Sequence, residues 1–167
     1  MALTRAVGPM AQPALGTEQA TTSGTSVDFT GIPAGVKMIL VSIVGLSGNG
    51  TSPFQIQIGD SGGIESTAYS SVAGFNDAVG VGGLASSTGF ILVPAIGAVN
   101  NYSFTAVMVL QSGTTWVCQA NGHQNGATVV TISNGHKTLS AELDRIRLTT
   151  VNGTDTFDAG SINIAYF

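Results

Sequence analysis

The chain has 167 residues, of which 43% are hydrophobic, only 8% are charged and one is a cysteine, and its formal net charge is -4. Soluble domains carry about 25% charged residues, so this composition excludes a charge-rich disordered chain and a basic nucleic-acid-binding surface. The single Cys118 excludes an intrachain disulfide and a cysteine-based metal cluster. A single domain with a surface of hydroxyl and amide side chains is expected.

Residues 1–20 differ from the rest of the chain. They contain Pro9, Pro13 and two methionines, and they show no strand-like alternation. They predict an extended N-terminal docking arm, with a disordered leader as the alternative. The uninterrupted apolar stretch of a signal peptide is missing, and no apolar run approaches the roughly 20 residues of a membrane span. Neither export by that route nor membrane insertion is expected.

From residue 21 onward, apolar and polar residues alternate, and turns separate the runs. Five Asn-Gly pairs punctuate this region, and Asn-Gly suits the tight turns of β-hairpins. The expected strands lie near residues 27–29, 36–46, 54–58, 90–93, 102–110, 116–120, 130–132, 137–141, 143–151 and 161–167. Residues 61–87 are rich in Gly and Ser, and they are expected to form a long variable loop or an edge excursion.

The strand at residues 36–46 is apolar on both faces. Val36, Met38, Leu40, Val44 and Leu46 are expected on one face, and the other face carries isoleucines and valine. Such a strand is covered on both sides, either inside the fold or by a neighbouring subunit. The only helix candidate, residues 138–143, is short. The pattern predicts an all-β fold, an antiparallel jelly-roll-like β-sandwich of about nine to ten strands over residues 21–167.

The stretch GDSGG at residues 59–63 spells the surroundings of the nucleophilic serine in chymotrypsin-like proteases. A serine nucleophile needs a histidine base and an acid that orients it. Both histidines, His123 and His136, follow Ser61 in the chain, which contradicts the His-Asp-Ser order. We interpret Ser61 as part of a turn that ends the strand at residues 54–58. We predict no catalytic residue and no enzymatic activity.

The other polar candidates also fit structural roles better than chemistry. His123 and His136 each follow an Asn-Gly pair and are interpreted as solvated, because no further ligands stand at a metal-site spacing. Asp155 and Asp158 lie in one turn, where calcium is the minority alternative. No metal and no cofactor is expected. Arg145 and Arg147 share one strand face, with acids of the same chain or of a neighbouring subunit as candidate partners.

Trp116 and Cys118 share a strand face in residues 115–120. We interpret both as core residues, and Cys118 as a small hydrophobe instead of a reactive thiol. A sugar-binding sandwich that uses Trp116 for stacking is the alternative hypothesis.

Three blocks of sequence resemble a small β domain of tailed bacteriophages. They are TSGTSVDFTGIPAGVK at residues 22–37, GTSPFQIQIGDSGG at residues 50–63 and LDRIRLTTVNGTDTFDAGSINIAYF at residues 143–167. The domain resembled occurs at the C-terminal ends of tail fibres and related receptor-facing virion proteins. The end blocks are the more specific, and Lys37-Met38 stands where the family often has Lys-Arg.

The resemblance implies a non-enzymatic virion structural protein, made in the host cytoplasm. It implies a homotrimeric tail-fibre or receptor-binding tip component, attached to other virion proteins through residues 1–20. A host cell-surface glycan or protein is a further candidate partner, and the receptor-binding residues stay unassigned. Because only about twenty residues precede the domain, a capsid decoration (cement) protein or a small baseplate component is the alternative.

Overall fold

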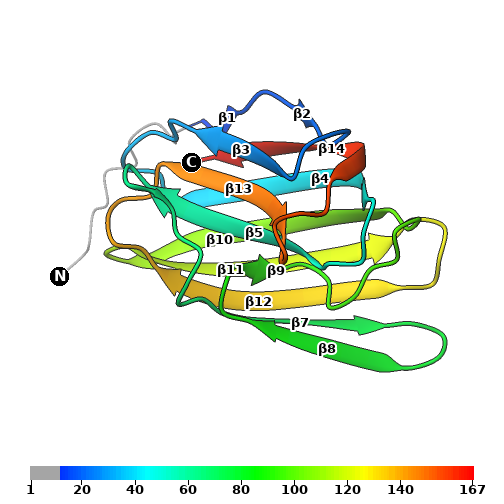
Figure 1. Cartoon of the computed structure of the whole chain (residues 1–167). Helices are drawn as coiled ribbons and strands as arrows, with labels where there is room; N and C mark the ends of the chain where they lie inside the picture. The colour runs from blue at the N-terminus through cyan, green and yellow to red at the C-terminus, as the bar shows by residue number, and fades with distance from the viewer. Residues whose placement is uncertain (1–11) are drawn as a thin grey trace.

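The structure, a computed structural model, describes residues 12–167, and this part of the chain contains fourteen strands and no helix. The strands form two sheets that pack face to face, and every strand pair is antiparallel (Figure 1). The predicted all-β sandwich is therefore confirmed, whereas the predicted number of nine to ten strands is too low, because short strands such as Ala14–Leu15, Gln19–Ala20 and Gly63–Ile64 and the hairpin at residues 70–86 were not expected. No helix in residues 12–167 is long and apolar enough to cross a membrane.

The larger sheet has nine strands. Their order is β1, β14, β4, β10, β11, β12, β7 and β8, and β2 also pairs with β14. The bounds are Ala14–Leu15 (β1), Gln19–Ala20 (β2), Met38–Gly48 (β4), Ser70–Asn76 (β7), Val81–Ser86 (β8), Tyr102–Ser112 (β10), Thr115–Gln124 (β11), Val130–Thr138 (β12) and Phe157–Tyr166 (β14).

The smaller sheet has five strands and covers only part of the larger one. Its order is β3, β13, β5 and β6, and β9 also pairs with β5. The bounds are Ser26–Thr30 (β3), Phe54–Asp60 (β5), Gly63–Ile64 (β6), Phe90–Ile91 (β9) and Arg145–Thr150 (β13). The β7–β8 hairpin lies at the bottom edge in Figure 1, beyond the strands of the smaller sheet.

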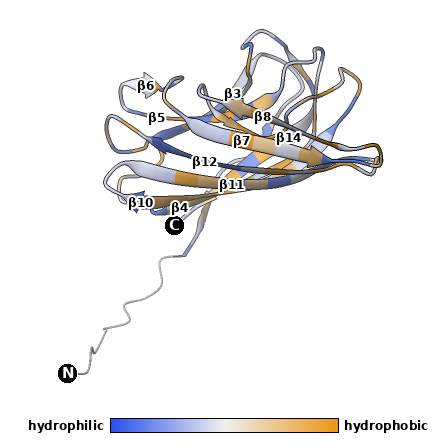
Figure 2. Ribbon diagram, turned by 90° about the horizontal axis from the view of Figure 1, so that it is seen from below, coloured by the Kyte–Doolittle hydropathy of each residue, from blue (hydrophilic) through white to orange (hydrophobic). Residues whose placement is uncertain are grey.

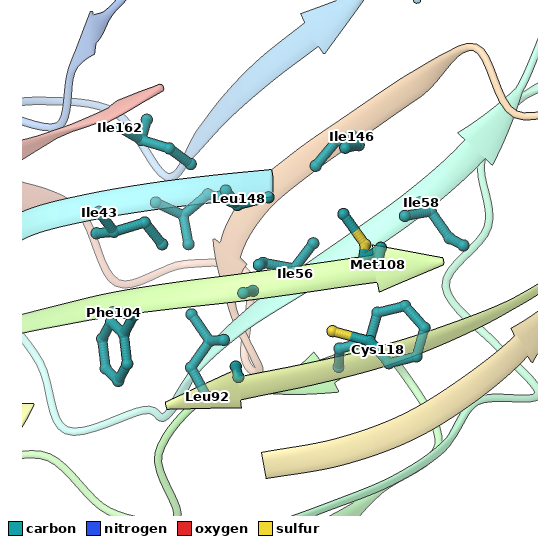
Figure 3. Close-up of a cluster of buried hydrophobic side chains, with 14 of the residues drawn as sticks. Ile43, Ile56, Ile58, Leu92, Phe104, Met108, Cys118, Ile146, Leu148 and Ile162 are labelled. Atoms are coloured by element: carbon teal, nitrogen blue, oxygen red, sulfur yellow. The ribbon is translucent and has the colours of Figure 1, made fainter. Parts of the chain in front are cut away.

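The core lies between the two sheets and is built from the inward residues of each alternating strand. Side chains from β4, β10 and β11 face those from β5 and β13 across the sandwich (Figure 3). The residues at the centre are almost fully buried: Ile43, Ile56, Ile58, Phe104, Met108, Cys118, Ile146 and Leu148. Burial of apolar area contributes about 25 cal/mol per Å², which makes this layer the main source of stability.

A bulge between β4 and β14 changes the direction of the side chains in β4. Gly45 (φ 67°) and Gly160 (φ 100°) lie against each other there, and both have positive φ values that favour glycine. Because the bulge interrupts the alternation, Leu46 turns into the core and is fully buried. The prediction that Leu46 shares a face with Val44 is therefore wrong, whereas Val44 stays 63% exposed.

Residues 61–87 contain more regular structure than a long loop. Strands β7 and β8 form a hairpin that extends the large sheet beyond β12. Of the two alternatives predicted for residues 61–87, the extension at the sheet edge is confirmed and the long variable loop is wrong. Strand propensity depends on context, and here glycine permits tight packing: a Cβ on Gly82 would lie 2.4 Å from the ring of Phe75. The hairpin could not be recognised in the sequence, because this segment contains too few large apolar residues to show a strand-like alternation.

The short helix candidate at residues 138–143 forms no helix, in agreement with the all-β prediction, but the separate strand expected at residues 137–141 is wrong. Strand β12 continues to Thr138, and the chain then passes to β13 without a helix. Leu139 and Leu143 are both buried in this connection, so tertiary packing decides its path.

The predicted N-terminal arm is described only in part. Residues 1–11 lie outside the described residues. The short strands β1 and β2, within residues 12–20, pair with β14 of the same chain.

Candidate functional site

Ser61 lies in the turn between β5 and β6, on the smaller sheet, and is exposed. Its neighbour Asp60 accepts a hydrogen bond from the backbone N–H of Gly62 at 2.8 Å and one from the Ser140 hydroxyl at 2.5 Å. These bonds, that from Ser140 first, hold the pKa of Asp60 below its ordinary value. The geometry is that of a turn stabilised by its own aspartate.

Both histidines of the chain lie on the other sheet. His123 on β11 and His136 on β12 are exposed on the outer face of the large sheet, because their neighbours in the strand point inward. The sandwich core therefore separates them from Ser61. Within residues 12–167, the structure therefore does not place a histidine beside Ser61.

A largely buried ion pair lies just after β6, which follows the turn that contains Ser61. The Lys137 ammonium lies 2.5 Å from Glu65, and the two side chains are 4% and 22% exposed. The same ammonium lies 5.4 Å from the ring centroid of Tyr69, a cation–π distance. The hydroxyl of Tyr69 accepts a hydrogen bond from Ile58 N–H at 2.8 Å. This cluster joins β12 to the segment after β5.

The carboxylate of Glu65 is held in its ionised form. Burial on its own would raise the pKa of Glu65, but hydrogen bonds from Lys137 and from the backbone N–H of Ser140, at 2.7 Å, outweigh it and lower the pKa. Its oxygens are thus occupied by partners within the chain. We interpret this cluster of Lys137, Glu65 and Tyr69 as one that stabilises the fold, and we assign it no catalytic role.

The remaining candidates have structural surroundings. Trp116 is 2% exposed and Cys118 is 1% exposed, so both face the core. Burial raises the pKa of the Cys118 thiol to about 12, which makes the thiolate inaccessible at neutral pH. Trp116 is not available to stack on a sugar.

Asp155 accepts hydrogen bonds from Asn152 at 2.7 Å and from the backbone N–H of Ser52 at 2.9 Å. These bonds lower its pKa and commit the carboxylate to the turn. Asp158 follows the buried Phe157 on β14, and its own side chain is exposed. Within residues 12–167 no group of three His, Cys, Asp or Glu side chains could hold a metal ion.

The two arginines of β13 pair within the chain. Arg147 forms two hydrogen bonds of 2.7 Å with the carboxylate of Asp28 on β3, and Arg145 pairs with the adjacent Asp144. Ile146 and Leu148, which alternate with the arginines along the strand, are fully buried. The predicted polar outer face and apolar inner face of this strand are confirmed, and the outer face of the smaller sheet is charged.

The outer face of the large sheet from β4 to the β8 edge has the opposite character. Over β4, β7, β8, β10, β11 and β12, the outward positions hold no Asp, Glu, Lys or Arg. Eight of the fourteen exposed large hydrophobic residues in the described part of the chain lie there: Met38, Val44, Val72, Val81, Val109, Val117, Val130 and Ile132. Figure 2 shows apolar segments along β7 and β11. We call these outward positions the uncharged face.

Sequence reasoning found one strand of the uncharged face and missed the others. The two-sided apolar pattern of residues 36–46 identified β4, but Val72 and Val117 have no large apolar residue two positions away, on the same face of their strand. An isolated valine gives no signal until strand pairing places it beside others. The register does this across β7, β12, β11 and β10.

Neither a comparison with models of known protein families nor a comparison with curated proteins finds a match for this chain.

Proposed function

We propose that this protein is a non-enzymatic structural protein of a tailed-bacteriophage virion. Its most specific role is a homotrimeric tail-fibre or receptor-binding tip component, attached through its N-terminal arm. The observation that carries the proposal is the separation of charge, because the smaller sheet carries salt bridges while the uncharged face exposes aliphatic side chains. Apolar patches of this kind on a soluble domain mark interaction sites.

The resemblance to phage β domains supports the location. Its two end blocks contribute strands β3 and β13, which pair residue by residue from Ser26 to Thr30. The Asp of the first block and the second Arg of the other block form the bidentate pair Asp28–Arg147. The residues that carry the resemblance thus form one structural unit.

The strand order also supports the jelly-roll interpretation. Strands β2, β14, β4 and β10 are neighbours in one sheet, and β3, β13, β5 and β9 are neighbours in the other. Successive strands of this set of eight alternate between the sheets for most of the chain, as expected for two interlocked Greek keys. The hairpins β7–β8 and β11–β12 then extend the first sheet.

The location is tested by the copy number and position of the protein in purified particles. Quantitative mass spectrometry and electron microscopy with a labelled chain should give a few to a few tens of copies, all at the tail. Hundreds of copies on the head would overturn the tail role and favour a capsid decoration protein. A site at the tail base, away from the tip, would favour a baseplate component.

Attachment through the arm is tested by deletion of residues 1–11. This truncation retains β1 and β2, which pair with β14, so the domain should stay folded but no longer join particles. Incorporation at the normal level would contradict the arm hypothesis. Ser61→Ala serves as the matched surface control, and it should leave both assembly and host adsorption unchanged.

A further inference from the structure

The uncharged face is a large, continuous surface. Neighbouring strands lie about 4.8 Å apart and each residue adds about 3.4 Å, so six strands of roughly nine residues present about 30 Å by 30 Å, or roughly 900 Å². A stable protein–protein interface needs roughly 800 Å² from each partner. The area of this face is therefore sufficient for one specific interface.

We propose that the uncharged face is the surface through which copies of this chain pack against one another. This inference rests on the proposed homo-oligomer and names the surface that forms it. The partner is a second copy of the chain, which brings its own uncharged face to the contact; in a trimer the three faces would surround the threefold axis. Homo-oligomer interfaces are more apolar than ordinary surface and are depleted of charge.

Electrostatics favour a second copy over a charged partner. The net charge of -4 arises from residues outside the uncharged face, so two such faces meet without repulsion between like charges. A different charged partner would gain nothing there in steering or specificity, because both depend on complementary charge. The two exposed histidines are the only titratable side chains at the outward positions of these six strands.

The polar residues of the face also suit self-association. Gln119 on β11 lies opposite Asn134 on β12, and Asn121 lies one pleat further along β11. A carboxamide both donates and accepts hydrogen bonds, so an amide can bond to the same amide in a second copy. No Phe, Tyr or Trp occupies an outward position of these six strands, which disfavours a sugar as the occupant because sugars stack on aromatic rings.

The edge of the sheet extends the same surface. Strand β8 is the last strand of the large sheet, and its sequence, VGGLAS, contains no charge and no proline. Exposed edge strands are usually protected from pairing by lysine, proline or a bulge. Val81 in this strand is 80% exposed. An edge without such protection is expected where a neighbouring copy covers it.

The test compares two valine-to-glutamate substitutions in the full chain. Val117 on the uncharged face and Val151 in the turn after β13 are similarly exposed, 44% and 39%. Light scattering and sedimentation at micromolar concentration should show an oligomer for the unmodified protein and for Val151→Glu. Val117→Glu should weaken self-association about tenfold or more, because a charge buried in an interface without a partner is costly.

Circular dichroism should show the same fold for all three proteins, because both valines are exposed. A monomeric unmodified protein, or a Val117→Glu oligomer as stable as that of Val151→Glu, would overturn the inference. Particle location is a separate readout. A monomer that still joins the tail would refute the interface and leave the virion role standing. An oligomer that is broken by Val117→Glu but absent from particles would refute only the virion role.

Discussion

The two residues of the Glu65–Lys137 ion pair should differ in how much stability is lost when each is replaced. Removal of one partner of a buried ion pair costs about 3–5 kcal/mol, because the other charge stays buried without compensation. The Lys137 side chain is 4% exposed, whereas that of Glu65 is 22% exposed. The ammonium cannot reach water easily, but the carboxylate can. Loss of Glu65 should therefore cost more than loss of Lys137.

We expect Glu65→Gln to lower the free energy of unfolding by about 3 kcal/mol, the lower end of the range, because the amide oxygen still accepts a hydrogen bond. Lys137→Met should cost about 1–2 kcal/mol, because the remaining carboxylate is partly hydrated and keeps its bond to Ser140 N–H. The double variant should cost less than the sum of the two single changes, since the residues are in contact.

Trp116 is the only tryptophan and is 2% exposed, so its fluorescence reports unfolding in urea. Thermal unfolding gives a second measurement, and about 3 kcal/mol corresponds to a shift in Tm of about 6–12 °C for a domain of this size. Protein concentration must be equal in all samples, because oligomers are stabilised by mass action. A Lys137→Met variant as unstable as Glu65→Gln would refute the reasoning from exposure.

Three further outcomes are expected. Glu65 and Asp60 have lowered pKa values in the fold, so their contribution is complete at neutral pH and is lost as the pH falls below 4.5, the ordinary value for glutamate; urea midpoints measured against pH should decline there. Gly113→Ala should cost ~1 kcal/mol because its φ is positive. Gly160→Ala should cost several times as much, because its φ is also positive and the added Cβ would lie only 2.6 Å from the backbone of Gly45. Equal urea midpoints for the two variants would contradict this expectation. Asp28→Asn should cost less than about 1 kcal/mol, because its pair is over one third exposed; a loss above 2 kcal/mol would count against it.

Much of the fold could be predicted from alternation in the sequence. The run at residues 102–110 predicted β10, and the inward residues Phe104 and Met108 are buried as expected. The polar cluster at Ser61 could not be predicted. Lys137 reads as a surface residue in an isolated strand, and its partner Glu65 is distant in sequence. Only the pairing of β12 with β7, and the path of the chain from β5, brings them together.

The uncharged face arises because a long stretch of the chain that is poor in charged residues forms neighbouring strands of one sheet. Residues 66–136 contain a single charged residue, Asp77, apart from the two histidines. This stretch with almost no charges is visible in the sequence. In a helical fold, or with another strand order, the same residues would be spread over several surfaces of the molecule. Here β10, β11 and β12 are successive hairpin neighbours and β7–β8 joins them at the edge, so the strands of this stretch other than β9 form one continuous part of the large sheet. Because the stretch is continuous in both sequence and space, a charge at any of its outward positions disturbs the same surface, which is why a single substitution at Val117 is a sufficient test.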